Sequence, residues 1–162
     1  MIKHPIDPVW DKDSKVLVLG SFPSVKSREQ MFFYGHVQNR FWRVAAAVRG
    51  CDIPLTVDEK RAFLLSNHIA VWDVIASCDI TGSSDSSIKN VVPNDISPIL
   101  NGANIKAVFT NGKTAHNLYQ KYIKDKVGRD DICLPSTSPA NAAWTLKLLT
   151  ESWKQICEYL ND

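Results

Sequence analysis

The chain has 162 residues, 44% of them hydrophobic and 22% charged, with a formal net charge of +2, which is typical of a single globular domain covering residues 1–162. No apolar run approaches the roughly 20 residues of a membrane span, and the N-terminus lacks the apolar segment of a signal peptide, so we expect a cytoplasmic protein without membrane contact. The small positive charge permits contact with nucleic acid but does not require it.

The first predicted element is a short buried strand at residues 15–19, where a Val-Leu-Val-Leu run leads into Gly20. A continuous apolar run of this length is typical of a parallel strand that is buried on both faces. Residues 20–38 form a long loop that holds many aromatic side chains, which argues against disorder. Because α/β sheets bind ligands at the carboxyl ends of their strands, we expect this loop to be functional.

The rest of the chain alternates predicted helices and strands. A helix with Asn39 as its N-cap should end at Gly50, and a capping-box pattern opens a second helix from Thr56 to about Ser66. The later predicted elements are a strand at 69–75, a serine- and aspartate-rich loop at 76–90, a short helix ending near residue 100, a strand at 105–110, a helix after Gly112, a strand at about 131–134 and a last helix that buries Leu149, Trp153, Ile156 and Leu160. This alternation predicts a three-layer α/β/α domain with a four-stranded, mainly parallel central sheet.

Small and polar residues follow three of the predicted strands. They are Gly-Ser-Phe-Pro-Ser at 20–24, Asn-Gly at 111–112 and Pro-Ser-Thr-Ser-Pro at 135–139. These loops should converge at one edge of the sheet, where hydroxyls, amides and an aromatic face suit a planar polar ligand such as a flipped nucleobase. Hydroxyls followed by a helix start near Asn141 would suit a phosphate.

Other chemistries find little support. The four cysteines, at positions 51, 78, 133 and 157, contain no Cys-x-x-Cys pair, so we expect buried free thiols and no metal or other cofactor. Neither a P-loop nor a Gly-x-Ser-x-Gly elbow is present. The four histidines are scattered along the sequence without paired ligand spacing.

Three motifs, taken in order, resemble the uracil-DNA glycosylase superfamily. They are residues 20–24, the Gly-His-Val-Gln-Asn-Arg-Phe-Trp run at 35–42 and the Leu-Pro-Ser-Thr-Ser-Pro-Ala-Asn run at 134–141. The resemblance covers nearly the whole chain and is closest to the hypoxanthine-DNA (deoxyinosine) glycosylases, while Asn-Arg-Phe-Trp is also similar to the mismatch-specific uracil glycosylases. Other branches carry Asp or Asn in the first motif as the group that acts on water, where this chain has Ser21 and Ser24. Some members hold an iron–sulfur cluster, for which the cysteine spacing is lacking.

The resemblance implies a uracil-DNA glycosylase-like fold and a monofunctional DNA glycosylase, which we expect to be a monomer. Its substrate would be double- or single-stranded DNA that contains a deaminated base, hypoxanthine first. A uracil-directed glycosylase and a non-catalytic nucleotide-binding α/β module remain as alternatives. Asn39 would take the catalytic role. The predicted base-binding residues are Gly20, Ser21, Phe22, Pro23, Tyr34, Asp73 and Asn111. The predicted DNA-binding residues are Ser24, Ser136, Thr137, Ser138, Pro139 and Asn141.

Several of these residues have a structural interpretation as well. Asn39 suits a helix N-cap, a role compatible with catalysis, and Phe22 suits core packing. Asp73 would be costly in its apolar strand without a partner, so it either reads the base or belongs to a buried pair. Asn111 suits a turn before glycine. Arg40 is expected to be solvated.

Overall fold

The predicted parallel sheet lies at the centre of the fold in the computed structural model, which describes residues 1–160. Its four strands run in the order β3 (Ile69–Asp73), β2 (Val16–Gly20), β6 (Ala107–Asn111) and β7 (Ile132–Leu134), and all neighbours are parallel. Every residue of β2 is buried, because this strand has a neighbour on each side and helices above and below. The prediction of a four-stranded parallel central sheet is confirmed.

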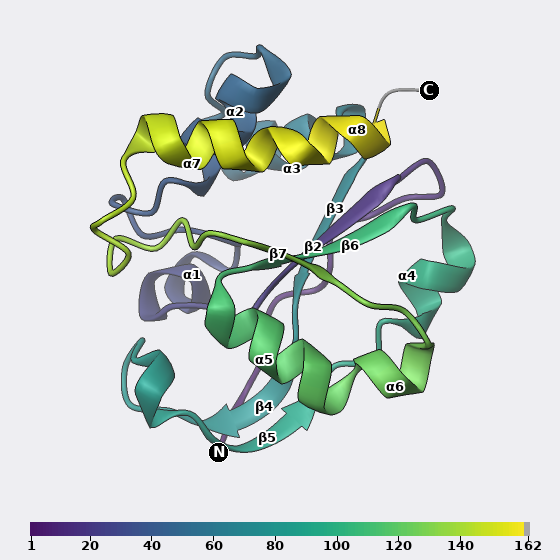
Figure 1. Cartoon of the computed structure of the whole chain (residues 1–162). Coiled ribbons are helices and arrows are strands. Elements are labelled where there is room, and N and C mark those ends of the chain that lie inside the picture. The colour runs from purple at the N-terminus through teal and green to yellow at the C-terminus, as the bar shows by residue number, and fades with distance from the viewer. Residues whose placement is uncertain (161–162) are drawn as a thin grey trace.

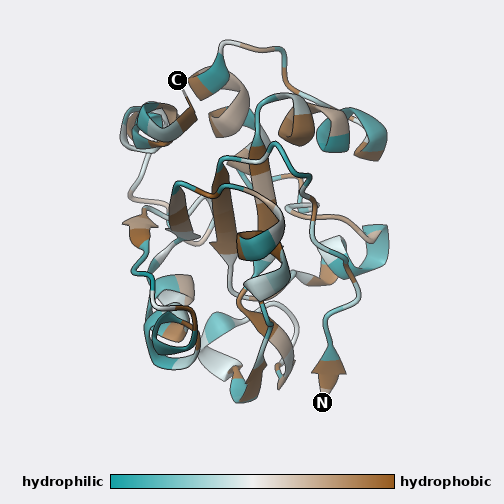
Figure 2. Ribbon diagram, turned by 90° about the vertical axis from the view of Figure 1, so that its right-hand side faces the viewer, coloured by the Kyte–Doolittle hydropathy of each residue, from teal (hydrophilic) through white to brown (hydrophobic). Residues whose placement is uncertain are grey.

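Helices cover both faces of this sheet (Figure 1). One layer contains α2 (Phe41–Arg49), α3 (Val57–Ser66), α7 (Leu146–Trp153), the short η2 (Lys154–Ile156) and α8 (Cys157–Leu160). The other contains α4 (Ser97–Gly102), α5 (Lys113–Tyr122) and α6 (Lys124–Val127). Along β2, Val16 and Val18 pack into the first core while Leu17 and Leu19 pack into the second, as the two-residue period of a strand requires. Figure 2 shows the apolar residues concentrated in these central strands.

A second, antiparallel sheet was not predicted. It consists of β1 (Ile2–Lys3), β4 (Ile75–Asp79) and β5 (Lys89–Pro93), in the order β1-β4-β5. The predicted strand at 69–75 is therefore two strands, and the predicted loop at 76–90 contains most of β4 and the start of β5. Many residues of this small sheet are exposed or half-buried. Its strands are short and mix polar with apolar residues, so they lack the apolar pattern that predicts a strand.

Two further local predictions need correction. The loop at 20–38 contains a short helix, α1 (Val25–Gln30), which Ser24 caps by accepting the backbone N–H of Ser27 over 3.2 Å. The N-cap of α2 is Arg40 rather than Asn39, although Asn39 Oδ1 accepts the N–H of Phe41 over 2.9 Å. The capping box of Thr56 with Glu59 and the end of α2 at Gly50 are as predicted.

The cysteines are free, but only Cys78 is buried. Cys51 and Cys133 are exposed, so the prediction of buried thiols is wrong for both, one lying in a surface loop and one on the edge strand β7. Within residues 1–160, no group of three or more His, Cys, Asp or Glu side chains could hold a metal ion. Over the same residues, no helix is both long enough and apolar enough for a membrane span.

Candidate active site

The carboxyl ends of β2, β3 and β6 surround a cavity of about 390 Å³. Gly20, Asp73 and Asn111 end these three strands, and the segment after β7 closes the cavity from the side of the C-terminal motif. Every predicted site residue except Asn141 lines this cavity. The structure thus brings the three sequence motifs together at one sheet edge.

Asn39 and Asn111 are joined through Thr137, which is fully buried. The Thr137 hydroxyl donates to Asn39 Oδ1 over 2.9 Å and accepts from Asn111 Nδ2 over 3.0 Å, while Asn111 Oδ1 accepts the Thr137 N–H over 3.0 Å. The N–H of Phe41 is the second donor to Asn39 Oδ1. Because a backbone N–H fixes which amide atom is the oxygen, Asn39 keeps its Nδ2 hydrogens for the cavity.

This arrangement changes the role predicted for Thr137. Its hydroxyl is used inside the protein by two asparagines and its surface is covered, which favours an internal role, while contact with DNA stays a prediction. Thr137 positions Asn39 relative to the end of β6.

Asp73 is 4% exposed and belongs to a buried pair. Its Oδ2 lies 2.7 Å from Nε2 of His4, and the two side chains are 5% and 3% exposed. His4 Nδ1 accepts the N–H of Ile6 over 3.2 Å, so the imidazole carries a proton on Nε2 and donates it to the carboxylate. The prediction that Asp73 belongs to a buried pair is therefore confirmed, through Oδ2. The residue also lines the cavity.

Tyr34 presents a buried hydroxyl without a hydrogen-bond partner in the described chain. Its ring stacks on Phe41 with centroids 4.1 Å apart. A Cβ added to Gly20 would lie 3.3 Å from this hydroxyl and 2.4 Å from Asp73 Oδ1, so both polar atoms border the same point. Burial, and then the Asp73 carboxylate, raise the pKa of Tyr34; the Asn111 side chain opposes the rise without completing a hydrogen bond. The phenol stays protonated and is a donor.

Phe22 is 9% exposed and packs with Ile75 and Cys78 in a small third core. The Arg28 guanidinium lies over its ring at 5.6 Å, and the His4 ring meets it edge-on at 5.8 Å. The core-packing interpretation of Phe22 is thus correct, and the ring also lines the cavity. Stacking of a base on it stays a prediction.

Arg40, expected to be solvated, instead holds the C-terminal motif. Its guanidinium donates to the backbone oxygens of Ser138 over 3.0 Å and of Asn141 over 3.1 Å, and also to that of Trp144. Its backbone N–H donates to the Thr137 oxygen over 3.0 Å. Sequence reasoning missed this role because the partners are carbonyls about 100 residues away, which carry no side-chain signal.

The serines of this motif lie at the rim of the cavity, half-buried. Ser136 Oγ accepts the N–H of Ser138 over 3.1 Å, and Ser138 Oγ accepts the N–H of Ala140 over 3.2 Å. Each hydroxyl therefore keeps its own proton for an outside acceptor. Asn141 lies outside the cavity lining and donates from Nδ2 to the Ser136 oxygen over 3.0 Å, so its amide shapes the loop.

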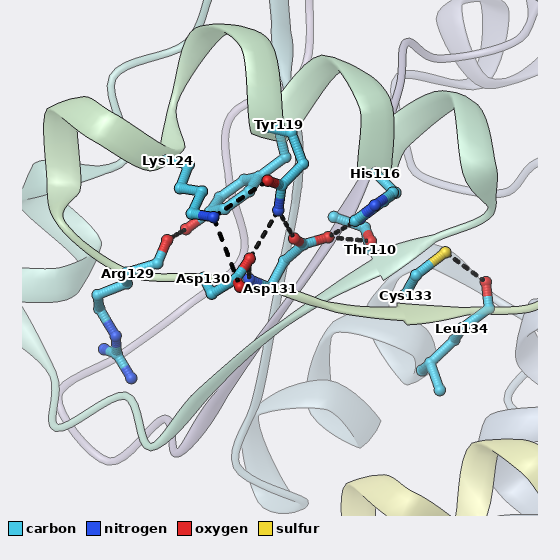
Figure 3. Close-up of polar contacts among 10 residues, drawn as sticks. Thr110, His116, Tyr119, Lys124, Arg129, Asp130, Asp131, Cys133 and Leu134 are labelled. Atoms are coloured by element: carbon cyan, nitrogen blue, oxygen red, sulfur yellow. Dashed lines mark hydrogen bonds and ion pairs between the residues drawn. The ribbon is translucent and has the colours of Figure 1, made fainter.

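A buried carboxylate, Asp131, fixes the strand end that carries Asn111 (Figure 3). Its Oδ2 accepts the Thr110 hydroxyl over 2.6 Å and lies 2.7 Å from His116 Nδ1, while its Oδ1 accepts the Gln120 amide over 2.6 Å. Thr110 precedes Asn111 in β6, the histidine and glutamine lie on α5, and Asp131 precedes β7. One carboxylate thereby ties together three elements next to the cavity.

Sequence reasoning also missed Asp85, which lines the cavity from the turn η1 (Asp85–Ser87). Its Oδ1 accepts the Ser21 hydroxyl over 3.2 Å. Loss of water where the protein covers its carboxylate raises the pKa of Asp85, and the negative charge of Asp73 raises it further. Hydrogen bonds from Ser21 and Thr114 oppose this rise. The sequence predicts the stretch around Asp85 only as part of a serine- and aspartate-rich loop.

Comparison with known proteins supplies independent information. The sequence of residues 8–160 matches the family model of the uracil DNA glycosylase superfamily. A protein named hypoxanthine DNA glycosylase from Methanosarcina barkeri is 31% identical over 157 residues, covering 96% of this chain and 98% of its own length. One of the same name from Methanosarcina acetivorans is 30% identical, with 96% and 98% covered. The solution NMR structure of a candidate uracil DNA glycosylase from M. acetivorans matches with a TM-score of 0.83 and 30% identity over 99% of each chain.

Proposed function

The chain belongs to the uracil DNA glycosylase superfamily, and from that premise we propose that this DNA glycosylase excises deaminated bases, hypoxanthine foremost, by hydrolysing the N-glycosidic bond. The observation that carries the proposal is the pair formed by the unpartnered Tyr34 hydroxyl and the Asp73 carboxylate beside Gly20. The choice of hypoxanthine within this class rests on the names of the two relatives.

The pair matches the edge that deamination creates. Hypoxanthine and uracil each offer an N–H donor beside a carbonyl acceptor, whereas adenine and cytosine offer an acceptor beside an amino group. Asp73 Oδ1 would accept the N–H, and the Tyr34 hydroxyl would donate to the carbonyl. Guanine and thymine carry the same edge, and their rejection rests on the cost of extruding a base from a matched pair.

Breaking the bond leaves negative charge on the base and positive charge on the sugar. Asn39 can stabilise the negative charge on the base. Its Oδ1 is already bonded to Phe41 and Thr137, which leaves the Nδ2 donor for the base. A donor aimed at the leaving base stabilises charge that develops only in the transition state. Phe22 would lie against the base, and no step requires a metal or nucleotide cofactor.

The rim of the cavity would hold the DNA strand. The free O–H groups of Ser136 and Ser138 would donate to phosphate oxygens, and Ser24 and Pro139 line the same opening. Such contacts position the strand without reading its sequence. A strand-cleaving lyase step needs an amine nucleophile, and no lysine belongs to the described cavity lining, which supports monofunctional hydrolysis.

The test is an excision assay with end-labelled duplexes that contain inosine, uracil or xanthine, with adenine, guanine and thymine duplexes as controls. We expect strand breaks only after alkali, fastest for inosine. A parallel purification from cells that do not express the chain controls for a contaminating glycosylase. Faster release of uracil would identify a uracil-directed enzyme. Release of no base from any duplex would refute the proposal in favour of a non-catalytic module.

A further inference from the structure

The attacking water loses a proton during hydrolysis, and a base that takes it accelerates the step, but the residues of the proposed mechanism do not supply one. The Asn39 amide is not basic, and its Oδ1 already accepts two hydrogen bonds. Ser21 and Ser24 lack the basicity as well. The described cavity lining offers four other titratable side chains, namely Tyr34, His36, Asp73 and Asp85.

Three of the four are unsuited by geometry. Tyr34 is buried and keeps its proton. Nδ1 of His36 accepts the N–H of Gln38 over 3.1 Å, so this imidazole presents Nε2–H, a donor, to its surroundings. Oδ2 of Asp73 is bonded to His4, and Oδ1 is engaged by the base in the function proposed above.

Asp85 has the properties that the others lack. It is exposed to water while lining the same cavity, and the Ser21 hydroxyl holds its Oδ1 beside the first sequence motif. Its turn is docked as well, because Arg28 donates to the Gly82 oxygen over 2.6 Å and the Val25 N–H donates to Ser83 Oγ over 2.9 Å. A carboxylate at a DNA-binding opening repels phosphate, so its placement beside the Ser21 hydroxyl, on a turn that is itself docked, favours a catalytic use.

We propose that Asp85 is the general base of the reaction, which rests on the proposed function. As the glycosidic bond breaks, its electron pair passes to the base, and water adds its oxygen to the anomeric carbon of the sugar. Asp85 takes the proton that the water loses and later releases it to the departing base. The products are the free base and an abasic site with a hydroxyl, so atoms and charge balance. The negative carboxylate also stabilises the cationic sugar.

The groups that face Asp85 define its pH behaviour. They are the hydroxyls of Ser21 and Thr114 and the Asp73 carboxylate. Although Asp85 is exposed at the surface, loss of water on the side where it contacts the protein and then the charge of Asp73 raise its pKa, against the hydrogen bonds from Ser21 and Thr114. A base must be deprotonated to act, so excision should fall as the pH drops through this raised pKa, at a higher pH than an ordinary carboxylate would give.

The test compares single-turnover excision of inosine by the wild type, Asp85→Asn and Asp85→Ala between pH 5 and 9. Glu29→Gln is the matched control, since Glu29 is a 59% exposed carboxylate on the neighbouring helix α1 that only pairs with Lys26. Removal of the base should lower the rate by about 10²–10⁴-fold and abolish the acidic limb of the profile. Affinity for undamaged duplex should stay equal or increase, and formate should partly restore Asp85→Ala. Ser21→Ala keeps the Asp85 carboxylate but removes the hydroxyl that donates to it, so it should give a smaller loss of rate.

Two outcomes would separate the possible failures. If the wild type excises inosine while Asp85→Asn retains its rate within about threefold and its pH profile, Asp85 is not the base. If the wild type releases no base, the proposed function fails and the role of Asp85 fails with it. Should Asp85→Asn melt far below the wild type, the pH profile of Ser21→Ala decides, since a shifted acidic limb supports the proposal and an unshifted one contradicts it.

Discussion

Replacing Asn39 with aspartate separates the two roles of its side chain. A carboxylate accepts from Phe41 and Thr137 as the amide oxygen does, so stability should be kept, but the Nδ2 donors are lost. Alanine removes both bonds, at about 1 kcal/mol for the cap-like bond and about 1–3 kcal/mol for the buried hydroxyl of Thr137 left without its acceptor. With about 2–4 °C per kcal/mol for a chain of this size, Asn39→Ala should melt roughly 4–16 °C lower.

Single-turnover excision of inosine and thermal unfolding, measured on the same preparations, check this reasoning. Both variants should lose about 10²–10³ in rate if Nδ2 acts on the leaving base. Thr137→Val is the matched control, because it breaks the bridge to Asn39 and Asn111 but leaves both amides in place. It should lose stability with a much smaller loss of rate. A wild-type rate for Asn39→Asp, with the rates of Asn39→Ala and Thr137→Val following their stability, would make Asn39 a structural residue only.

Four more predictions follow from the site. Asp73→Asn should lower excision of inosine and of uracil alike, because both bases would donate their N–H to Oδ1; unchanged rates with a lowered melting temperature would leave Asp73 only its pair with His4. Gly20→Ala should abolish excision, since the new Cβ would lie 2.4 Å from Asp73 Oδ1, and wild-type activity would refute this packing. Replacing Ser136 and Ser138 together with alanine should weaken binding of damaged and undamaged duplexes alike, by roughly fivefold per lost bond, as measured by fluorescence anisotropy. Excision should survive excess chelator, and a loss that added metal reverses would contradict the expectation of no cofactor.

The sequence predicted the parallel sheet and its functional edge because both depend on local patterns. The apolar run of β2 and the polar turns after β2, β6 and β7 are signals within a few residues. Strands that are parallel bring their carboxyl ends to one edge, so the order of the motifs was enough to predict which residues share the cavity. Asn141 was the exception because a loop residue can turn either way.

Partners far apart in the chain could not be predicted in this way. His4 is 69 residues from Asp73, and Asp85 is 64 residues from Ser21. The second sheet brings both contacts about, since β1 carries the chain into His4 and β4 leads to the turn with Asp85. Its strands are short and polar, so they lack the apolar periodicity on which strand prediction depends.

The polar atoms around the cavity fall into two groups, and the division bears on function. Asn39 Oδ1, the Thr137 hydroxyl and Asp73 Oδ2 are bonded within the protein. The Tyr34 hydroxyl is buried without a partner, and such a group costs about 1–3 kcal/mol in a folded protein. A ligand that brings a carbonyl accepts the proton of this hydroxyl and removes the cost, whereas one that brings an amino group leaves the proton without an acceptor. In the proposed function, the groups that discriminate between bases are therefore in place before DNA binds, because the bonded atoms fix the side chains around them.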